Sequence, residues 1–166
     1  MNYASVLDCD VVNGKYVGVS VFCQGCPEPH CSGCFNSSAW EFNGGRIFGE
    51  KEENNLFSLI DKPYIKRISI LGGEPLCDQN INTITKLVKD CKEKFPDKKI
   101  WLWTGYNFPD YKNMEFAKYI DYVVDGKFIE KEKDLSIAFR GSKNQTIWEK
   151  TLDGSWVNST NKYDLC

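Results

Sequence analysis

Apolar residues occupy every second position over residues 17–23, with Gly18, Ser20 and Phe22 between them: Val17, Val19, Val21 and Cys23. A period of two predicts a β-strand, so we expect a strand that ends where a group of cysteines begins. Apolar runs at residues 65–71, 99–104 and 122–125 predict three further strands. Each run ends in a glycine-containing or polar turn.

A helical period governs residues 81–95, where the apolar positions are Ile81, Ile84, Leu87, Val88, Cys91 and Phe95. This spacing predicts an amphipathic helix, with Asp78 or Asn80 available to cap its start and Pro96 just beyond its end. Shorter helices are expected at residues 56–60 and 114–120. The segment after Asp153 is polar and predicts no element.

Strands that alternate with helices favour an α/β fold with parallel strands. The carboxyl ends of parallel strands meet at one edge of the sheet, so the turns that follow the four strands are expected to lie together. Four strands are too few for a closed eight-stranded barrel, and 166 residues suit one domain, residues 1–166.

Composition narrows the classes of function. Hydrophobic residues make up 42% of the chain and its net charge is −2, as in folded globular proteins, and no basic run marks a nucleic-acid surface. The first residues lack a basic segment followed by an apolar one, and no apolar run is long enough to cross a bilayer. We therefore expect a cytoplasmic protein that binds neither nucleic acid nor membrane.

Cysteines provide the strongest chemical signal. The chain has eight, and four of them fall within twelve residues: Cys23, Cys26, Cys31 and Cys34. In a cytoplasmic protein such a cluster indicates metal or redox chemistry rather than disulfides. Thiolates on a short loop are suited to an iron–sulfur cluster, and three of them leave one iron open to a further ligand.

The choice of ligands leaves alternatives. With Cys23 the spacing C-x2-C-x4-C-x2-C also fits a four-thiolate zinc site, although its pairs stand closer together than in common zinc patterns. Cys23 continues the apolar face of its strand, so we expect its side chain in the core. Buried free thiols are a third reading, and His30, the only histidine, is either a ligand or an ordinary loop residue.

Several motifs together resemble the radical S-adenosylmethionine (SAM) superfamily and, within it, the family of activating proteins of anaerobic ribonucleoside-triphosphate reductases. The similarity rests on the cysteine loop, on the turn Gly72-Gly73-Glu74-Pro75 and on further segments at residues 10–14, 34–36, 103–106, 121–126 and 140–145. The chain departs from the family at the cysteine loop, which reads C-x4-C-x2-C where C-x3-C-x2-C is usual. We expect the two prolines of the longer segment to let it bulge outward.

The resemblance implies a shortened, open (β/α) partial barrel that carries a [4Fe–4S] cluster on Cys26, Cys31 and Cys34. It implies that SAM binds the open iron, that an electron from a reduced flavodoxin-like donor cleaves SAM, and that the resulting 5′-deoxyadenosyl radical abstracts hydrogen from a glycine of the large reductase subunit. No catalytic residue beyond the cluster ligands is implied. Two other functions stay open: a small radical SAM enzyme with a small-molecule substrate, such as a deazapurine synthase, and a zinc-stabilised binding module.

The resemblance also suggests residues that bind SAM: Gly33, Cys34, Phe35, Asn36, Gly72, Gly73, Glu74 and Thr104. Each has a plainer reading. The glycines and Glu74 also suit a β-turn, Asn36 also suits a helix cap, and Thr104 also suits a strand end. Cys91 is expected in the core, and a redox role is weighed for Cys77 and Cys166.

Overall fold

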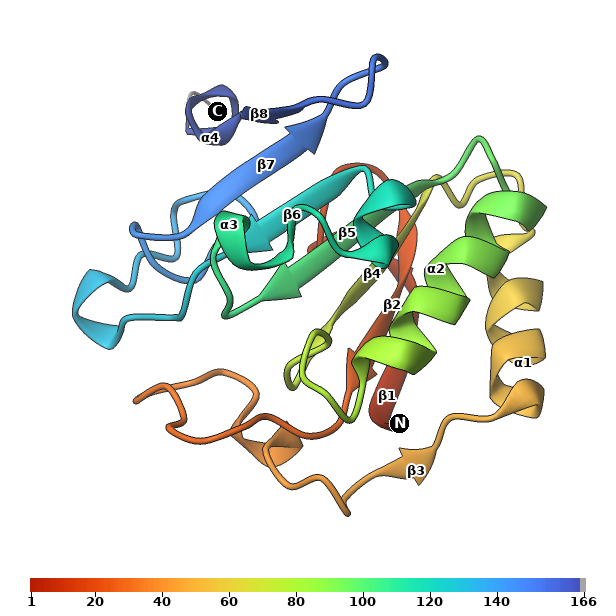
Figure 1. The fold of residues 1–166 in the computed structure, drawn as a ribbon, viewed down its shortest axis with the longest axis horizontal. Helices are drawn as coiled ribbons and strands as arrows, with labels where there is room; N and C mark the ends of the chain where they lie inside the picture. The colour runs from red at the N-terminus through yellow and green to blue at the C-terminus, as the bar shows by residue number, and fades with distance from the viewer. Residues whose placement is uncertain (165–166) are drawn as a thin grey trace.

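In the computed structural model, which describes residues 1–164, eight strands form one open sheet in the order β3-β1-β2-β4-β5-β6-β7-β8 (Figure 1). The central strands β2, β4, β5 and β6 are parallel, and the pairs toward both edges are antiparallel. The strands are β1 Asn2–Asp10, β2 Gly18–Cys23, β3 Arg46–Ile47, β4 Arg67–Gly72, β5 Lys99–Thr104, β6 Tyr122–Asp125, β7 Thr146–Lys150 and β8 Trp156–Asn158.

The two long helices lie on the same face of the sheet (Figure 1). The remaining helical elements are a single turn or slightly more. The helices are α1 Glu50–Ile60, α2 Ile81–Lys94, α3 Phe108–Tyr111 and α4 Thr160–Tyr163, and the 3-10 turns are η1 Ser37–Ala39, η2 Glu115–Lys118 and η3 Glu130–Glu132.

The four predicted strands and the main helix are confirmed, with differences at their ends. The second strand begins at Arg67 rather than residue 65, and α1 begins six residues before the predicted start because its first turns are acidic and mostly exposed. The helix predicted at residues 114–120 is a 3-10 turn. The prediction of no element after Asp153 is wrong, since β8 and α4 lie there; β8 is held by pairing with β7, which a local pattern does not encode.

The two faces of the sheet are filled differently. Under the helices, apolar side chains from β2, β4 and β5 pack with α1 and α2 in the main core, which includes Cys91 as expected. The opposite face holds Arg67, which has no exposed surface and forms an ion pair with Asp10 (3.5 Å). Gly14, in the segment after β1, lies against Arg67 and Trp101, so this segment covers the polar part of that face.

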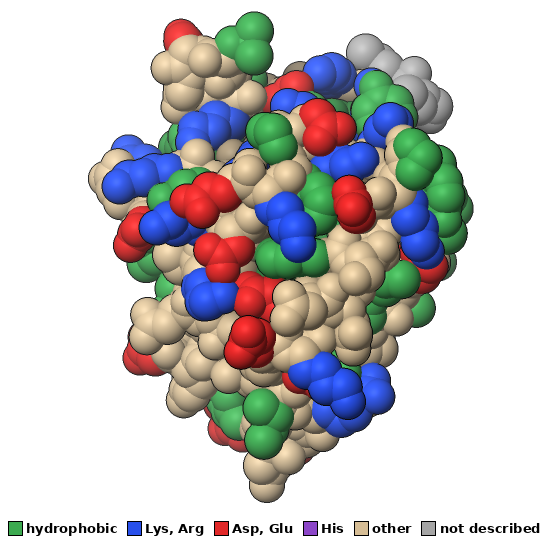
Figure 2. All heavy atoms as spheres, turned by 90° about the vertical axis from the view of Figure 1, so that its right-hand side faces the viewer, with side chains coloured by type: hydrophobic (Ala, Val, Ile, Leu, Met, Phe, Trp, Pro, Cys, Tyr) green, Lys and Arg blue, Asp and Glu red, His purple; other side chains and the backbone are tan. Residues whose placement is uncertain are grey.

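The carboxyl ends of the parallel strands meet as expected, because Cys23 pairs with Gly72 and Thr104 pairs with Asp125. Acidic and basic side chains are interspersed on the α1 and α2 side of the molecule (Figure 2). Lys86 bridges Glu53 of α1 and Asp90 of α2 there. Within residues 1–164, no helix has the length and apolar character needed to cross a membrane.

Candidate functional site

The cysteine loop leaves the sheet at the end of β2. Cys23 is the last residue of that strand and is completely buried, which confirms that its side chain belongs to the core. Cys26, Cys31 and Cys34 follow on the loop and are each partly buried. Cys31 and Cys34 lie one turn apart, since the N–H of Cys34 donates to the carbonyl of Cys31 (3.3 Å).

The Cys26 thiol lies in a setting that disfavours negative charge. Burial, followed by the charges of Glu74, Cys31 and Cys34, raises the pKa of the Cys26 thiol to about 12. A positively charged centre relieves the mutual repulsion of thiolates. The three cysteines therefore suit a metal ion or a metal cluster.

Soft sulfur donors and partial burial also fit an iron–sulfur cluster. In the described part of the chain, no three His, Cys, Asp or Glu side chains converge as a metal site does. The three thiols lie on one loop but do not converge in this arrangement.

The glycine-rich turn after β4 is bonded to the base of this loop. The N–H of Gly73 donates to the carbonyl of Cys23 (2.8 Å), and the N–H of Glu74 donates to the carbonyl of Gly25 (2.8 Å). A Cβ on Gly73 would lie 2.2 Å from the Gly25 oxygen, so only glycine permits this approach. Gly72 has φ +111° and would place its Cβ 2.6 Å from the Cys23 oxygen. Both glycines therefore serve contact between backbone segments, which brings the two motifs together.

Glu74 then links this turn to the end of β5. Its buried carboxylate accepts hydrogen bonds from the Leu76 N–H (2.9 Å), the Thr104 hydroxyl (2.6 Å) and the Gly105 N–H (2.7 Å). Burial raises the pKa of Glu74, and these three donors act in the opposite direction. The arrangement fixes the ends of β4 and β5 side by side.

Two buried side chains that the sequence did not predict as site residues, Asn80 and Gln24, complete the connection. The Asn80 amide donates to the carbonyls of Gln24 (3.1 Å) and Glu74 (2.9 Å). Asn80 precedes α2 as predicted but makes no side-chain cap. The Gln24 amide donates to the Glu41 carbonyl (2.8 Å) and so holds the far end of the cysteine loop. Gln24 directly follows a predicted strand, which was an available signal, whereas the sequence carries no signal for the contacts that Asn80 makes.

The residues around the last cysteine face the segment after β6. Gly33 lies against Glu130, because a Cβ on Gly33 would meet the Glu130 carboxyl carbon at 2.7 Å. Phe35 is 56% exposed and packs on Phe128, with ring centroids 5.1 Å apart. The Asn36 N–H lies 3.4 Å from the Cys34 sulfur, and Asn36 precedes η1 without a side-chain cap. Gly33, Phe35 and Asn36 thus flank Cys34, and none of them has a hydrogen bond to Glu74 within the described residues.

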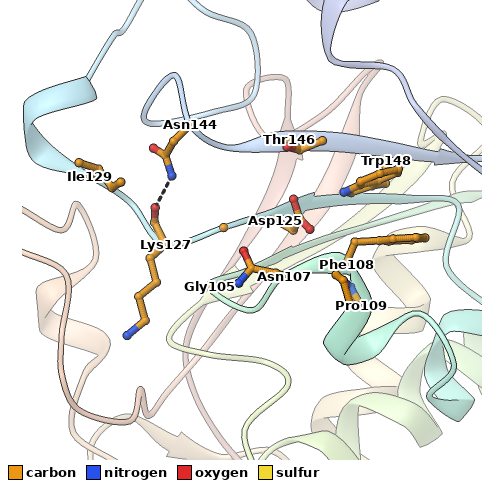
Figure 3. A pocket seen from close by; sticks show the side chains of 11 residues that line it. Gly105, Asn107, Phe108, Pro109, Asp125, Lys127, Ile129, Asn144, Thr146 and Trp148 are labelled. Atoms are coloured by element: carbon orange, nitrogen blue, oxygen red, sulfur yellow. Dashed lines mark hydrogen bonds between the residues drawn. The ribbon is translucent and has the colours of Figure 1, made fainter.

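A cleft of about 490 Å³ opens between α3, β6 and β7 (Figure 3). Asp125 lies at its base and receives a hydrogen bond from Tyr111 (3.1 Å), and burial raises the Asp125 pKa. Phe108 and Trp148 stack along one wall, 4.1 Å apart. Lys127 at the rim extends toward the cysteine loop, where its ammonium donates to the Pro29 carbonyl (3.3 Å). None of the predicted cluster ligands or SAM-binding residues lines the cleft. Cys166, for which a redox role was weighed, lies outside the described residues.

Comparison with known proteins identifies the family. Residues 12–148 match the family described as a 4Fe-4S single cluster domain. Over 156 residues the chain is 43% identical to the anaerobic ribonucleoside-triphosphate reductase-activating protein of Enterobacteria phage T4, covering 94% of this chain and 98% of that protein. The proteins of the same name from Vibrio cholerae and Escherichia coli K12 are each 38% identical, with 92% and 89% of this chain covered and 100% and 97% of theirs.

The chain belongs to the family of anaerobic ribonucleoside-triphosphate reductase-activating proteins. This confirms the resemblance that the motifs indicated. The match to a 4Fe-4S domain over residues 12–148 also supports an iron–sulfur cluster in this protein.

Proposed function

We propose that this protein activates an anaerobic ribonucleotide reductase by radical SAM chemistry. Cys26, Cys31 and Cys34 hold a [4Fe–4S] cluster in this proposal. When bound and reduced, the cluster supplies the electron that cleaves SAM to methionine and a 5′-deoxyadenosyl radical, which takes a hydrogen atom from a glycine of the large reductase subunit. The electron comes from a reduced flavodoxin-like protein.

The observation that carries the proposal is the bonding of the Gly72 to Pro75 turn to the cysteine loop. Through the bonds from Gly73 and Glu74 to Cys23 and Gly25, the turn stands directly beside the loop. Cleavage of a molecule bound to the cluster needs a second group that orients it, and this turn is backbone at a strand end that is bonded directly to the base of the loop.

The residues have distinct roles in this proposal. The backbone at Gly72 and Gly73 offers carbonyl oxygens to the SAM ammonium, and Glu74 with Thr104 holds that backbone still. Gly33 and Phe35 offer a backbone edge and an aromatic ring to adenine, while Asn36 orients Cys34 through the contact of its N–H with sulfur. We take the open sheet as a shortened (β/α) barrel and residues 1–166 as one domain.

The family supports this reading over its competitors. A small-molecule substrate, as in a deazapurine synthase, finds no support in the names of the relatives, which are all reductase-activating proteins. A zinc module would need a fourth ligand, and Cys23 is fully buried in the core.

The test is product analysis after anaerobic reconstitution with iron and sulfide. The reduced protein is mixed with SAM, and 5′-deoxyadenosine and methionine are quantified together. Their formation in equal amounts supports the proposal. The proposal would be overturned if a loaded, reducible cluster yielded neither product, whether or not the reductase was present. One equivalent of bound zinc without iron would instead favour the zinc-stabilised binding module.

A further inference from the structure

The segment between the first two cysteines of the loop cannot close itself through its backbone. A tight turn that starts at Cys26 is normally closed by the N–H three residues on, which donates to the Cys26 carbonyl. That residue is Pro29, and proline has no N–H. Pro27 likewise donates nothing, so the Cys26 carbonyl must find a donor elsewhere.

His30 supplies that donor from its side chain. Its Nε2 lies 2.9 Å from the Cys26 carbonyl oxygen. Because a carbonyl oxygen only accepts hydrogen bonds, this nitrogen carries the proton and donates. The imidazole therefore supplies the donor that the two prolines cannot.

Trp40 contacts both His30 and the main chain of Cys26. The His30 and Trp40 rings are stacked, with centroids 4.2 Å apart and planes within 6°. The Trp40 carbonyl also accepts the N–H of Cys26 (2.9 Å), next to the bond from the Gly25 N–H to the Ala39 carbonyl (2.8 Å). Both polar groups of the Cys26 main chain are thus engaged, one by His30 and one by Trp40, and the two partners are joined by ring stacking.

We propose that His30 is a positioning residue that fixes the main chain at Cys26, and thereby sets how the six-residue segment from Cys26 to Cys31 presents its two thiolates to the iron–sulfur cluster. The inference rests on the proposed function, in which these cysteines hold the cluster. The Nε2 proton is directed to a carbonyl and the ring face lies against Trp40, and the inference takes the other ring nitrogen, Nδ1, to make no bond to the cluster.

Two substitutions divide the contributions of His30. His30→Phe keeps an aromatic ring for Trp40 but removes the donor, whereas His30→Gln restores a donor without the ring. Glu28→Gln is the matched control, because Glu28 is an exposed residue of the same segment. Each variant and the unaltered protein are reconstituted anaerobically, and three quantities are measured: iron and sulfide per chain, the rate at which an iron chelator removes the cluster, and the electron paramagnetic resonance (EPR) spectrum of the reduced cluster.

We expect His30→Phe to lose its cluster to the chelator about tenfold faster than the unaltered protein, with a broadened spectrum, since the loss of groups that orient metal ligands costs about this factor. His30→Gln should recover part of the retention, and Glu28→Gln should match the unaltered protein. Thermal unfolding of the cluster-free variants should be unchanged, because His30 lies outside the core.

Equal chelation rates and identical spectra for His30→Phe and the unaltered protein would overturn the inference. Nitrogen hyperfine coupling from His30 in pulsed EPR would also overturn it, because His30 would then be a ligand. If the unaltered protein itself retains no cluster, the proposed function fails and this inference fails with it. Faster loss of the cluster from His30→Phe than from both the unaltered protein and Glu28→Gln therefore reports on His30 alone.

Discussion

The carboxylate of Glu74, beyond the end of β4, accepts a hydrogen bond of 2.6 Å from the hydroxyl of Thr104, the last residue of β5. Both groups are buried, and the same carboxylate also binds the N–H of Gly105 (2.7 Å). Two turns that are thirty residues apart in sequence are thereby held as one unit beside the cysteine loop. Both of these hydrogen bonds depend on the Glu74 side chain.

Glu74→Gln tests that dependence. Glutamine keeps one acceptor oxygen where three donors converge, so a buried donor loses its partner at a cost of about 1–3 kcal/mol. Urea unfolding of the cluster-free protein measures the change. The double variant Glu74→Gln with Thr104→Val should lose less stability than the two single variants lose in total, because the two residues share one hydrogen bond. Simple additivity would contradict the coupling.

Gly73→Ala should separate the glycine-rich turn from the cysteine loop. The added methyl group would lie 2.2 Å from the Gly25 oxygen, which is backbone and has little room to retreat. We expect a loss of about 1–3 kcal/mol in stability, with weakened SAM binding in isothermal titration of the loaded protein. Gly49→Ala is the control, since its nearest neighbour is the flexible Glu52 side chain at 3.4 Å. Equal effects of the two substitutions would refute the packing argument.

The cysteines should divide into two classes. Alanine at Cys26, Cys31 or Cys34 should abolish cluster binding, measured as iron and sulfide per chain. Cys23→Ala should retain the cluster and lose about 1–2 kcal/mol of stability, because it removes a small buried apolar group. Loss of iron from Cys23→Ala together with retention in the other three would reverse the assignment.

Asp10 gives the fold an acid-sensitive contact. Burial opposes its charge, but hydrogen bonds from Ser20, the Val12 N–H and Asn13, with the charge of Arg67, hold the Asp10 pKa below its usual value. A lowered folded-state pKa contributes stability above the unfolded value of about 3.9, and this stability is lost as the pH falls through the folded value. Urea midpoints measured between pH 7 and pH 3 should show that decline.

Asp10→Asn should make the loss of stability between pH 7 and pH 3 smaller. The variant should also be less stable than the unaltered protein at pH 7. Arg67 would keep a buried charge without its carboxylate partner, at a cost of about 3–5 kcal/mol. Unchanged stability at pH 7 would show that Ser69 and the backbone carbonyls already suffice for Arg67.

The sequence predicted those parts of the fold whose signals are local. The strands β2, β4, β5 and β6 are buried apolar runs, and α2 has one apolar face, so their periods are clear. By contrast, β1 carries bulges near Tyr3 and Leu7 that interrupt its alternation, and Leu7 is 46% exposed. β7 and β8 are defined by pairing with distant strands, which a local pattern does not contain.

The candidate site divides in the same way. The cysteine spacing and the glycine-rich turn were visible as motifs, and their common edge followed from parallel strands. The role of Asn80 was not predictable, because it depends on which carbonyls the folded backbone brings within reach of its amide. The stacking of His30 on Trp40 likewise arises from the path of the loop rather than from spacing.

The most direct test of the central claim is EPR of the reductase after activation. The loaded protein is mixed anaerobically with SAM, a reductant and the large subunit of an anaerobic ribonucleotide reductase, with Cys34→Ala as the control. The account predicts a glycyl-radical signal on the reductase that requires SAM and is absent with Cys34→Ala. A signal of equal size with Cys34→Ala, or no signal from an active reductase and a fully loaded cluster, would contradict it.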